Sequence, residues 1–257
     1  MYAPASGGAP VVRMIAAQAA LETKMLLRNG EQLLLTVIIP SLLLVLFSTV
    51  DIIAVPVSTA DGTGRSVDFL APGILALAVL STAFTGQAIA TGFERRYGVL
   101  KRLGASPLPR WALMTAKTLS VLVTEVLQIV LLAVIAFALG WDPQGSPASV
   151  VLLLVLGTAA FSGLGLLMAG TLKAEATLAA ANLVFLLLLV GGGVIVPLDK
   201  FPDAAQSVLG LLPISALSDG LRDVLQHGAG LPWGALGILA AWAVLGLGAA
   251  AKFFRWE

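Results

Sequence analysis

Residues 148–196 read ASVVLLLVLGTAAFSGLGLLMAGTLKAEATLAAANLVFLLLLVGGGVIV, an apolar run that only Lys173 and Glu175 interrupt. As a single helix these 49 residues would extend about 73 Å, whereas the roughly 30 Å hydrocarbon core of a bilayer needs only about 20 residues. The run therefore predicts two membrane-spanning segments that are joined by a tight hairpin at the two charged residues.

The rest of the chain has the same character. Of its 257 residues, 58% are hydrophobic and 11% are charged, compared with roughly 25% charged residues in an ordinary soluble domain. Such continuous apolar runs lack the alternation of a barrel strand, and a helix satisfies every backbone polar group within lipid. The sequence therefore predicts an all-α integral membrane protein with a single transmembrane domain over residues 1–257. Its six expected transmembrane helices are Leu33–Val50, Phe69–Phe93, Trp111–Leu139, Ala148–Leu172, Ala174–Val196 and Trp233–Ala251.

Basic residues indicate how the chain crosses the membrane, because Lys and Arg are retained on the cytoplasmic side. The N-terminal segment, the second and fourth connections and the C-terminal tail together contain eleven Lys and Arg, against three in the other connections. We therefore expect a multi-pass protein of the cell membrane with both termini in the cytoplasm.

Two segments outside the spans are expected to lie along the membrane. Residues 11–30 place Val12 and Ile15 on one helical face and Arg13 and Lys24 on the other, which is typical of an amphipathic helix in the cytoplasmic interface. This helix could be a simple anchor that sets the orientation of the chain, or it could have a mechanical role in the protein; the sequence leaves both interpretations open. Residues 197–231 contain too many charges for a span, and they predict a partly re-entrant pair of short helices that caps the external side.

The loop at residues 94–110 reads ERRYGVLKRLGASPLPR. Tyr97, Leu100 and Leu103 recur at helical spacing among basic residues, and a Gly-x-x-Pro-x-Pro stop follows them. A charge run of this kind is often only a topology signal with affinity for anionic lipid. The regularly spaced apolar residues favour a short helix that docks into a groove of another protein.

The segment Glu94–Lys117, ERRYGVLKRLGASPLPRWALMTAK, resembles the same loop and the third helix of ABC-2-type permeases, the membrane halves of bacterial exporters of the daunorubicin-resistance and polysaccharide-export kind. Ala216–Arg222, ALSDGLR, resembles part of that family's last external loop, and the likeness covers nearly the whole chain. It implies that residues 94–110 form a cytoplasmic coupling helix that contacts an ATPase subunit. The contact residues that it implies are Glu94, Arg95, Tyr97, Gly98, Leu100, Lys101, Leu103 and Pro107.

The resemblance implies a permease subunit in a bacterial cell membrane that exports an amphipathic, drug-like or lipid-linked molecule, as in multidrug efflux. Two copies of a cytoplasmic ATPase would bind the ATP and Mg, and a second permease chain would complete a homodimer or a homologous heterodimer. Membrane lipid is expected as a further partner, and nucleic acid is not expected as one. The chain has no G-x-x-x-x-G-K-[ST] phosphate loop, so no cofactor and no enzymatic activity of its own are expected. With no cysteine and one histidine, no metal site is expected either.

Polar residues within the spans are the candidates for a translocation path. Glu125 lies about 21 Å along the third span, too deep to reach the interface, whereas Lys117 near its start is expected to extend to the cytoplasmic headgroups. Glu125 could form a structural hydrogen bond, bind a cationic substrate or carry a proton. Proton transfer by Glu125 would indicate a proton-coupled secondary transporter. An intramembrane enzyme is a weaker alternative, because the membrane spans show no second catalytic group. The path candidates are Glu125, Gln128, Gln87 and Asn182.

Overall fold

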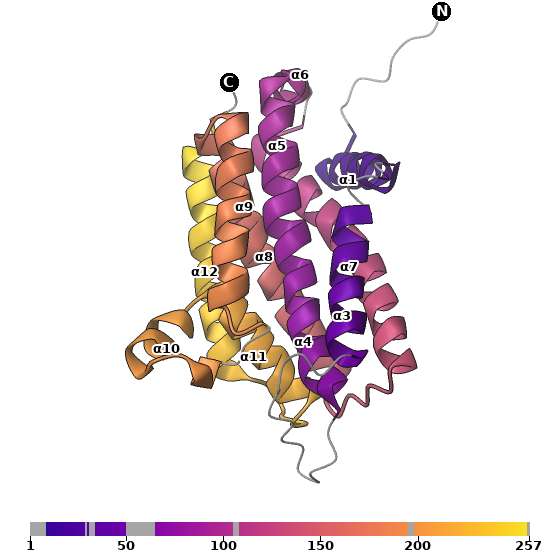
Figure 1. Ribbon diagram of the computed structural model, residues 1–257. Helices are drawn as coiled ribbons and strands as arrows, with labels where there is room; N and C mark the ends of the chain where they lie inside the picture. Colours follow the sequence, from indigo (N-terminus) through magenta and orange to yellow (C-terminus); the bar gives the residue numbers. More distant parts are fainter. Residues whose placement is uncertain are drawn as a thin grey trace, which may run out of the picture.

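The computed structural model describes residues 9–28, 30, 34–49, 65–104, 108–194 and 198–255. All regular secondary structure within these residues is helical, and the long helices lie side by side in one bundle (Figure 1). Five helices are long and apolar enough to cross a membrane. The expectation of an all-α membrane protein is therefore confirmed.

Five of the expected spans have a matching long helix. The second is a continuous helical segment made of α4 (Ser66–Val79), η2 (Leu80–Gly86) and α5 (Gln87–Arg96), in which η2 has π-helical hydrogen bonding. The others are α7 (Arg110–Ala138), α8 (Pro147–Thr171), α9 (Ala174–Gly191) and α12 (Trp233–Phe253).

The hairpin at Lys173 is confirmed, since α8 ends at Thr171 and α9 begins at Ala174. The fifth span ends earlier than expected, at Gly191 rather than Val196. Its glycine run explains the difference: Gly193 has a φ of +68°, a left-handed conformation that glycine adopts readily and that ends a helix.

The expected first span corresponds to a shorter apolar helix. It consists of η1 (Leu34–Ile38), a π-helical segment, followed by α3 (Ile39–Thr49). Leu33 and Val50, the expected ends, lie outside the described residues. The count of six spans therefore stays a prediction.

The two ends of the bundle carry different short helices (Figure 1). At one end lies α6 (Val99–Gly104), and beside it α1 (Val11–Arg28) packs on α7 and lies across the direction of the long helices. We call this the α6 end; α12 also finishes there. A helix at residues 11–30 was expected, and its helical structure is confirmed.

The opposite end, here the α11 end, carries η3 (Leu198–Lys200), α10 (Asp203–Leu209) and α11 (Pro213–Leu225). Helix α10 buries none of its side chains, whereas α11 is largely buried against α4, α8 and α12. The expected pair of short helices is therefore present, but only its second member is built into the bundle.

Close helix packing around α8 depends on small residues. At the crossing with α12, a Cβ added to Gly163 would come within 2.5 Å of the backbone nitrogen of Leu247. Small residues of this kind let two helix backbones approach closely in a membrane, where van der Waals contact replaces the hydrophobic driving force. This packing holds α8 at the centre of the bundle, beside the polar sites described next.

Candidate functional site

A cavity of about 190 Å³ lies between α1 and the helices next to it, and its surface is mostly apolar, although charged and amide side chains are among its lining residues. Its walls come from α1, η1, η2, α5 and α7, so it lies between the amphipathic helix and the first three expected spans. Its charged lining residues come from α1, α5 and α7, and its hydroxyl and amide groups come from η1, η2, α5 and α7. Apolar side chains, including Met25, Leu26 and Val121, complete the lining.

Three charged residues from three elements meet at this cavity. The Lys117 Nζ atom lies 2.6 Å from Glu94 Oε2 and 3.3 Å from Glu22 Oε2, and the lysine side chain is only 6% exposed. The expectation that Lys117 extends to the lipid headgroups is therefore wrong. The reason is tertiary: α1 covers the start of α7 and brings a second carboxylate to the lysine.

Glu22 occupies the least favourable position of the three. Burial raises its pKa, and the positive charge of Lys117 together with a hydrogen bond from Gln18 only partly opposes this change. A buried carboxylate that shares its single cation with a second carboxylate is costly to ionise. The cavity thus has one more acidic group than basic groups among the residues that line it.

Deeper in the bundle, Gln128 joins the first three expected spans. Thr82 of η2 donates a 2.8 Å hydrogen bond to Gln128 Oε1, and the Gln128 amide donates to the Thr36 carbonyl of η1. Gln87 lines the same cavity at 5% exposure. Neither its amide nitrogen nor its oxygen has a hydrogen-bond partner among the described residues.

The other two path candidates lie elsewhere. Glu125 is buried between α7 and α8, where its Oε2 accepts a hydrogen bond from Thr158 and its Oε1 has no partner within the described part of the chain. Asn182 is exposed on α9 and donates to the Leu178 carbonyl of its own helix. Gln87 therefore lines the cavity and Gln128 binds two of its lining residues, whereas the Glu125 side chain bonds to α8 and Asn182 is exposed on α9.

A short helix, α6, lies within the expected coupling loop, but the side chains that it exposes differ from those expected. Gly98, with a φ of +69°, lets the chain turn from α5 into α6. Tyr97 is 65% exposed and Lys101 is also exposed, whereas Leu100 is 1% exposed. The prediction that Leu100 contacts an ATPase is therefore corrected: this side chain packs into its own protein. Leu103 is half-buried, and Pro107 lies outside the described residues.

The charged residues that precede α6 are bound to their own chain. The Glu94 carboxylate points into the cavity cluster, and the Arg95 guanidinium donates to the Gly170 carbonyl at 2.7 Å and to the Leu172 carbonyl. Arg96 forms an ion pair with Glu175. These contacts join the end of α5 to the turn between α8 and α9. The sequence analysis treated residues 94–110 as an isolated loop and did not predict them.

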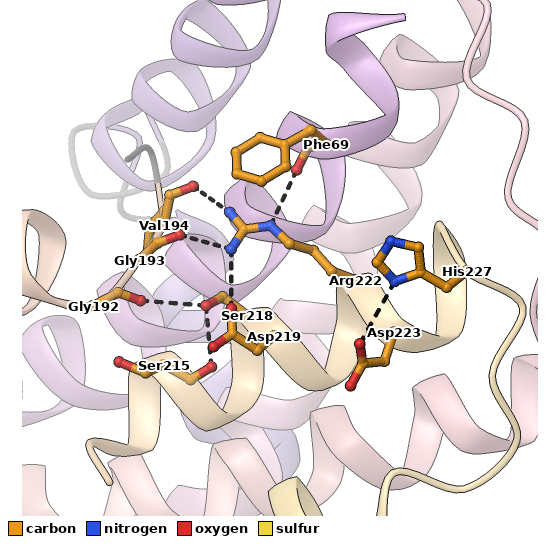
Figure 2. A network of polar contacts seen from close by, with 10 residues as sticks. All are labelled: Phe69, Gly192, Gly193, Val194, Ser215, Ser218, Asp219, Arg222, Asp223 and His227. Atoms are coloured by element: carbon orange, nitrogen blue, oxygen red, sulfur yellow. Dashed lines mark hydrogen bonds and ion pairs between the residues drawn. The ribbon is translucent and has the colours of Figure 1, made fainter. Parts of the chain in front are cut away.

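A second polar network stabilises the α11 end (Figure 2). Arg222 of α11 donates to the carbonyls of Gly193 and Val194, both at 2.7 Å, and its guanidinium lies 3.9 Å from the centre of the Phe69 ring. Asp219, one turn earlier, accepts from the same guanidinium at 3.2 Å. Sequence reasoning counted Arg222 only as a loop charge; its place within ALSDGLR was the available signal.

Residues 16–225 match the family model described as ABC-2 type transporter. The chain belongs to this family. Over 167 residues it is 29% identical to the linearmycin resistance permease protein LnrN of Bacillus subtilis (strain 168), an alignment that covers 63% of this chain and 43% of that protein. Over 231 residues it is 25% identical to the putative transport permease YvfS of the same strain, covering 89% and 91% of the two chains.

The match to the ABC-2 family extends from α1 to the end of α11. It therefore includes the cavity, α6 and the Arg222 network, and it confirms the family resemblance that residues 94–117 suggested. The chain is thus a multi-pass membrane permease of a family whose members generally work with a cytoplasmic ATPase subunit.

Proposed function

We propose that this ABC-2 permease exports an amphipathic, drug-like or lipid-linked molecule with energy from ATP that a separate cytoplasmic subunit hydrolyses. Two ATPase copies and a second permease chain, identical or homologous, would complete the transporter. The chain itself would be no enzyme, and ATP and Mg would bind to the partner. The name of the linearmycin resistance relative supports an antibiotic-like cargo.

The observation that carries this proposal is the position of α6. It lies at one end of the bundle, directly after a helical segment, Ser66–Arg96, that is long enough to cross the membrane. Tyr97 and Lys101 are exposed there. A partner that pushes on these residues would act on the whole segment, because an unbroken helix transmits displacement along its axis. The α6 end is then the cytoplasmic end, with both termini on that side.

The contacts of Arg95 and Arg96 support this coupling. They tie the base of α6 to the turn between α8 and α9, so displacement of α6 would reach the fourth and fifth spans as well as the second. Interfaces of packed helices change arrangement in this way during ligand-driven transitions. The transport cycle would therefore begin at the exposed face of α6.

Purification from the native membrane in a mild detergent, followed by mass spectrometry of co-eluting proteins, tests the proposal. The wild type should retain a stoichiometric soluble protein with a phosphate loop. The double variant Tyr97→Asp with Lys101→Glu should lose it, because Tyr97, in the turn before α6, and Lys101, on α6, are both exposed, and the changes spare the buried Leu100. Lys200→Glu, an exposed charge reversal at the α11 end, is the matched control and should retain the partner. Absence of any such partner from the folded wild type refutes the proposal.

A further inference from the structure

The cavity beneath α1 has an unbalanced charge. Lys117 is the basic residue that pairs with Glu22 and Glu94, and within the described ranges no second basic side chain forms an ion pair with either carboxylate. A buried charge is costly unless it is paired. One positive charge is therefore missing from the cavity when both carboxylates are ionised.

Gln87 supplies an independent observation. Its side chain is nine-tenths buried and lines the cavity, yet neither polar atom has a hydrogen-bond partner in the part of the chain that the structure describes. Buried polar groups in native proteins are almost always hydrogen-bonded, and each exception needs an explanation. The Gln87 Oε1 and Nε2 atoms, buried at the cavity wall without partners, indicate a position for a polar ligand group.

The size and lining restrict what can bind. A volume of about 190 Å³ equals roughly six water molecules at about 30 Å³ each, which suits a small headgroup rather than a whole drug-sized molecule. Met25, Leu26 and Val121 provide apolar surface beside the polar groups. A compact cation that is attached to an apolar chain fits this size and this lining.

From these contacts we propose that the cavity binds the ammonium headgroup of an amphiphile. The ammonium would pair with Glu22, which has the longer of the two contacts to Lys117, and would take Gln87 Oε1 as a further polar partner. The apolar chain would lie against Met25 and Leu26 of α1. If the proposed export function holds, the exported molecules would be amphiphiles with an ammonium headgroup. The binding site itself does not depend on that function.

A binding measurement on the full-length chain in phosphatidylglycerol nanodiscs tests the site, because this lipid contains no ammonium group. The probes are radiolabelled choline and its neutral carbon analogue 3,3-dimethylbutan-1-ol, which has nearly the same shape. Saturable binding of choline at one site per chain, with much weaker binding of the neutral analogue, is expected. Equal affinity for the two probes, or no saturable choline binding, overturns the proposal.

Two variants connect the binding to this cavity. Glu22→Gln should weaken choline binding about thirtyfold. This is the lower end of the range of losses that is typical when one partner of a buried charge pair is truncated. Gln87→Leu should also weaken it, although removal of an unpartnered buried amide is expected to leave the fold as stable or more stable. Asp203→Asn, an exposed carboxylate on α10, is the control and should bind normally. Wild-type affinity in both cavity variants overturns the proposal.

Choline affinity should also fall as the pH is lowered. Burial raises the pKa of Glu22 above its ordinary value, while Lys117 of α7 and Gln18 of its own helix lower it and Glu94 of α5 raises it. Protonation removes the negative charge that the ammonium needs, so binding is strongest above this raised pKa and is lost below it. The Glu22→Gln variant should lose this pH dependence; an unchanged pH profile in that variant overturns the assignment to Glu22.

Changing the lipid of the nanodiscs distinguishes two sources of the headgroup, a membrane lipid and a free amphiphile. If a membrane lipid occupies the cavity, phosphatidylethanolamine in the nanodiscs should reduce choline binding by competition. If the ligand is a free amphiphile, choline binding should be the same in both lipids. Both results support an ammonium site. An ATPase that co-purifies with a chain that does not bind choline overturns this inference and leaves the proposed function intact.

Discussion

Replacing Lys117 with methionine should destabilise the permease more than any simple loss of a contact would suggest. The substitution keeps the volume of the side chain but leaves Glu22 and Glu94, at 3.3 and 2.6 Å from the lost ammonium, without a cation. Removal of one partner from a buried ion pair costs about 3–5 kcal/mol. Because the Glu94 side chain is 28% exposed and water can stabilise its charge, we expect the lower end, about 3 kcal/mol.

The free energy of unfolding can be followed by tryptophan fluorescence during denaturant titration in detergent, since the chain has five tryptophans. The matched control is the triple variant Lys117→Met, Glu22→Gln and Glu94→Gln, which removes all three charges together. It should recover most of the lost stability, because replacing a whole buried ionic group is often neutral. A triple variant as unstable as the single one, or a single variant that costs under about 1 kcal/mol, would refute the electrostatic reasoning.

Two further predictions concern the α7–α8 contact and the α11 end. Glu125→Gln should leave stability and ATP-driven transport unchanged, because an amide oxygen can still accept the hydrogen bond from Thr158; loss of transport with normal ATPase activity of the partner would instead support proton coupling. Arg222→Lys should loosen the α11 end by about 2 kcal/mol, since lysine cannot donate in two directions from a planar group. A cysteine placed at buried Ser215 in this cysteine-free chain should then react faster with a water-soluble maleimide, whereas an unchanged rate would contradict the role of Arg222.

The sequence could predict features that depend on one segment and the thickness of a bilayer. The hairpin at Lys173 follows from length alone, because no single helix of 49 residues fits across the hydrocarbon core. The helical character of residues 11–28 and of α6 follows from periodicity. None of these inferences needs a distant part of the chain.

Predictions failed where the partner of a side chain came from a distant segment. The spacing of Tyr97 and Leu100 correctly indicates a helix, but periodicity does not say which face packs on the bundle, and Leu100 lies on the buried one. The expectation for Lys117 considered only its own helix, whereas α1 brings Glu22 from 95 residues away along the chain. Arg222 likewise acquires its role from the carbonyls of Gly193 and Val194.

The two π-helical segments, η1 and η2, show why the polar interior in particular could not be read from the sequence. Gln128 accepts a hydrogen bond from Thr82 in η2 and donates one to the Thr36 carbonyl in η1, so both wide turns lie beside the same amide. Segments of π-helix occur mostly as single-turn insertions within α-helices and are frequent at functional sites, and Thr82 and Thr36 both line the cavity. The backbone of the second span, and of the shorter apolar helix that corresponds to the expected first span, thus deviates from α-helical geometry beside these polar side chains. A hydropathy pattern records only that these residues are apolar enough for lipid. It does not record the hydrogen bonds between segments that place Thr82 and Thr36 beside the Gln128 amide.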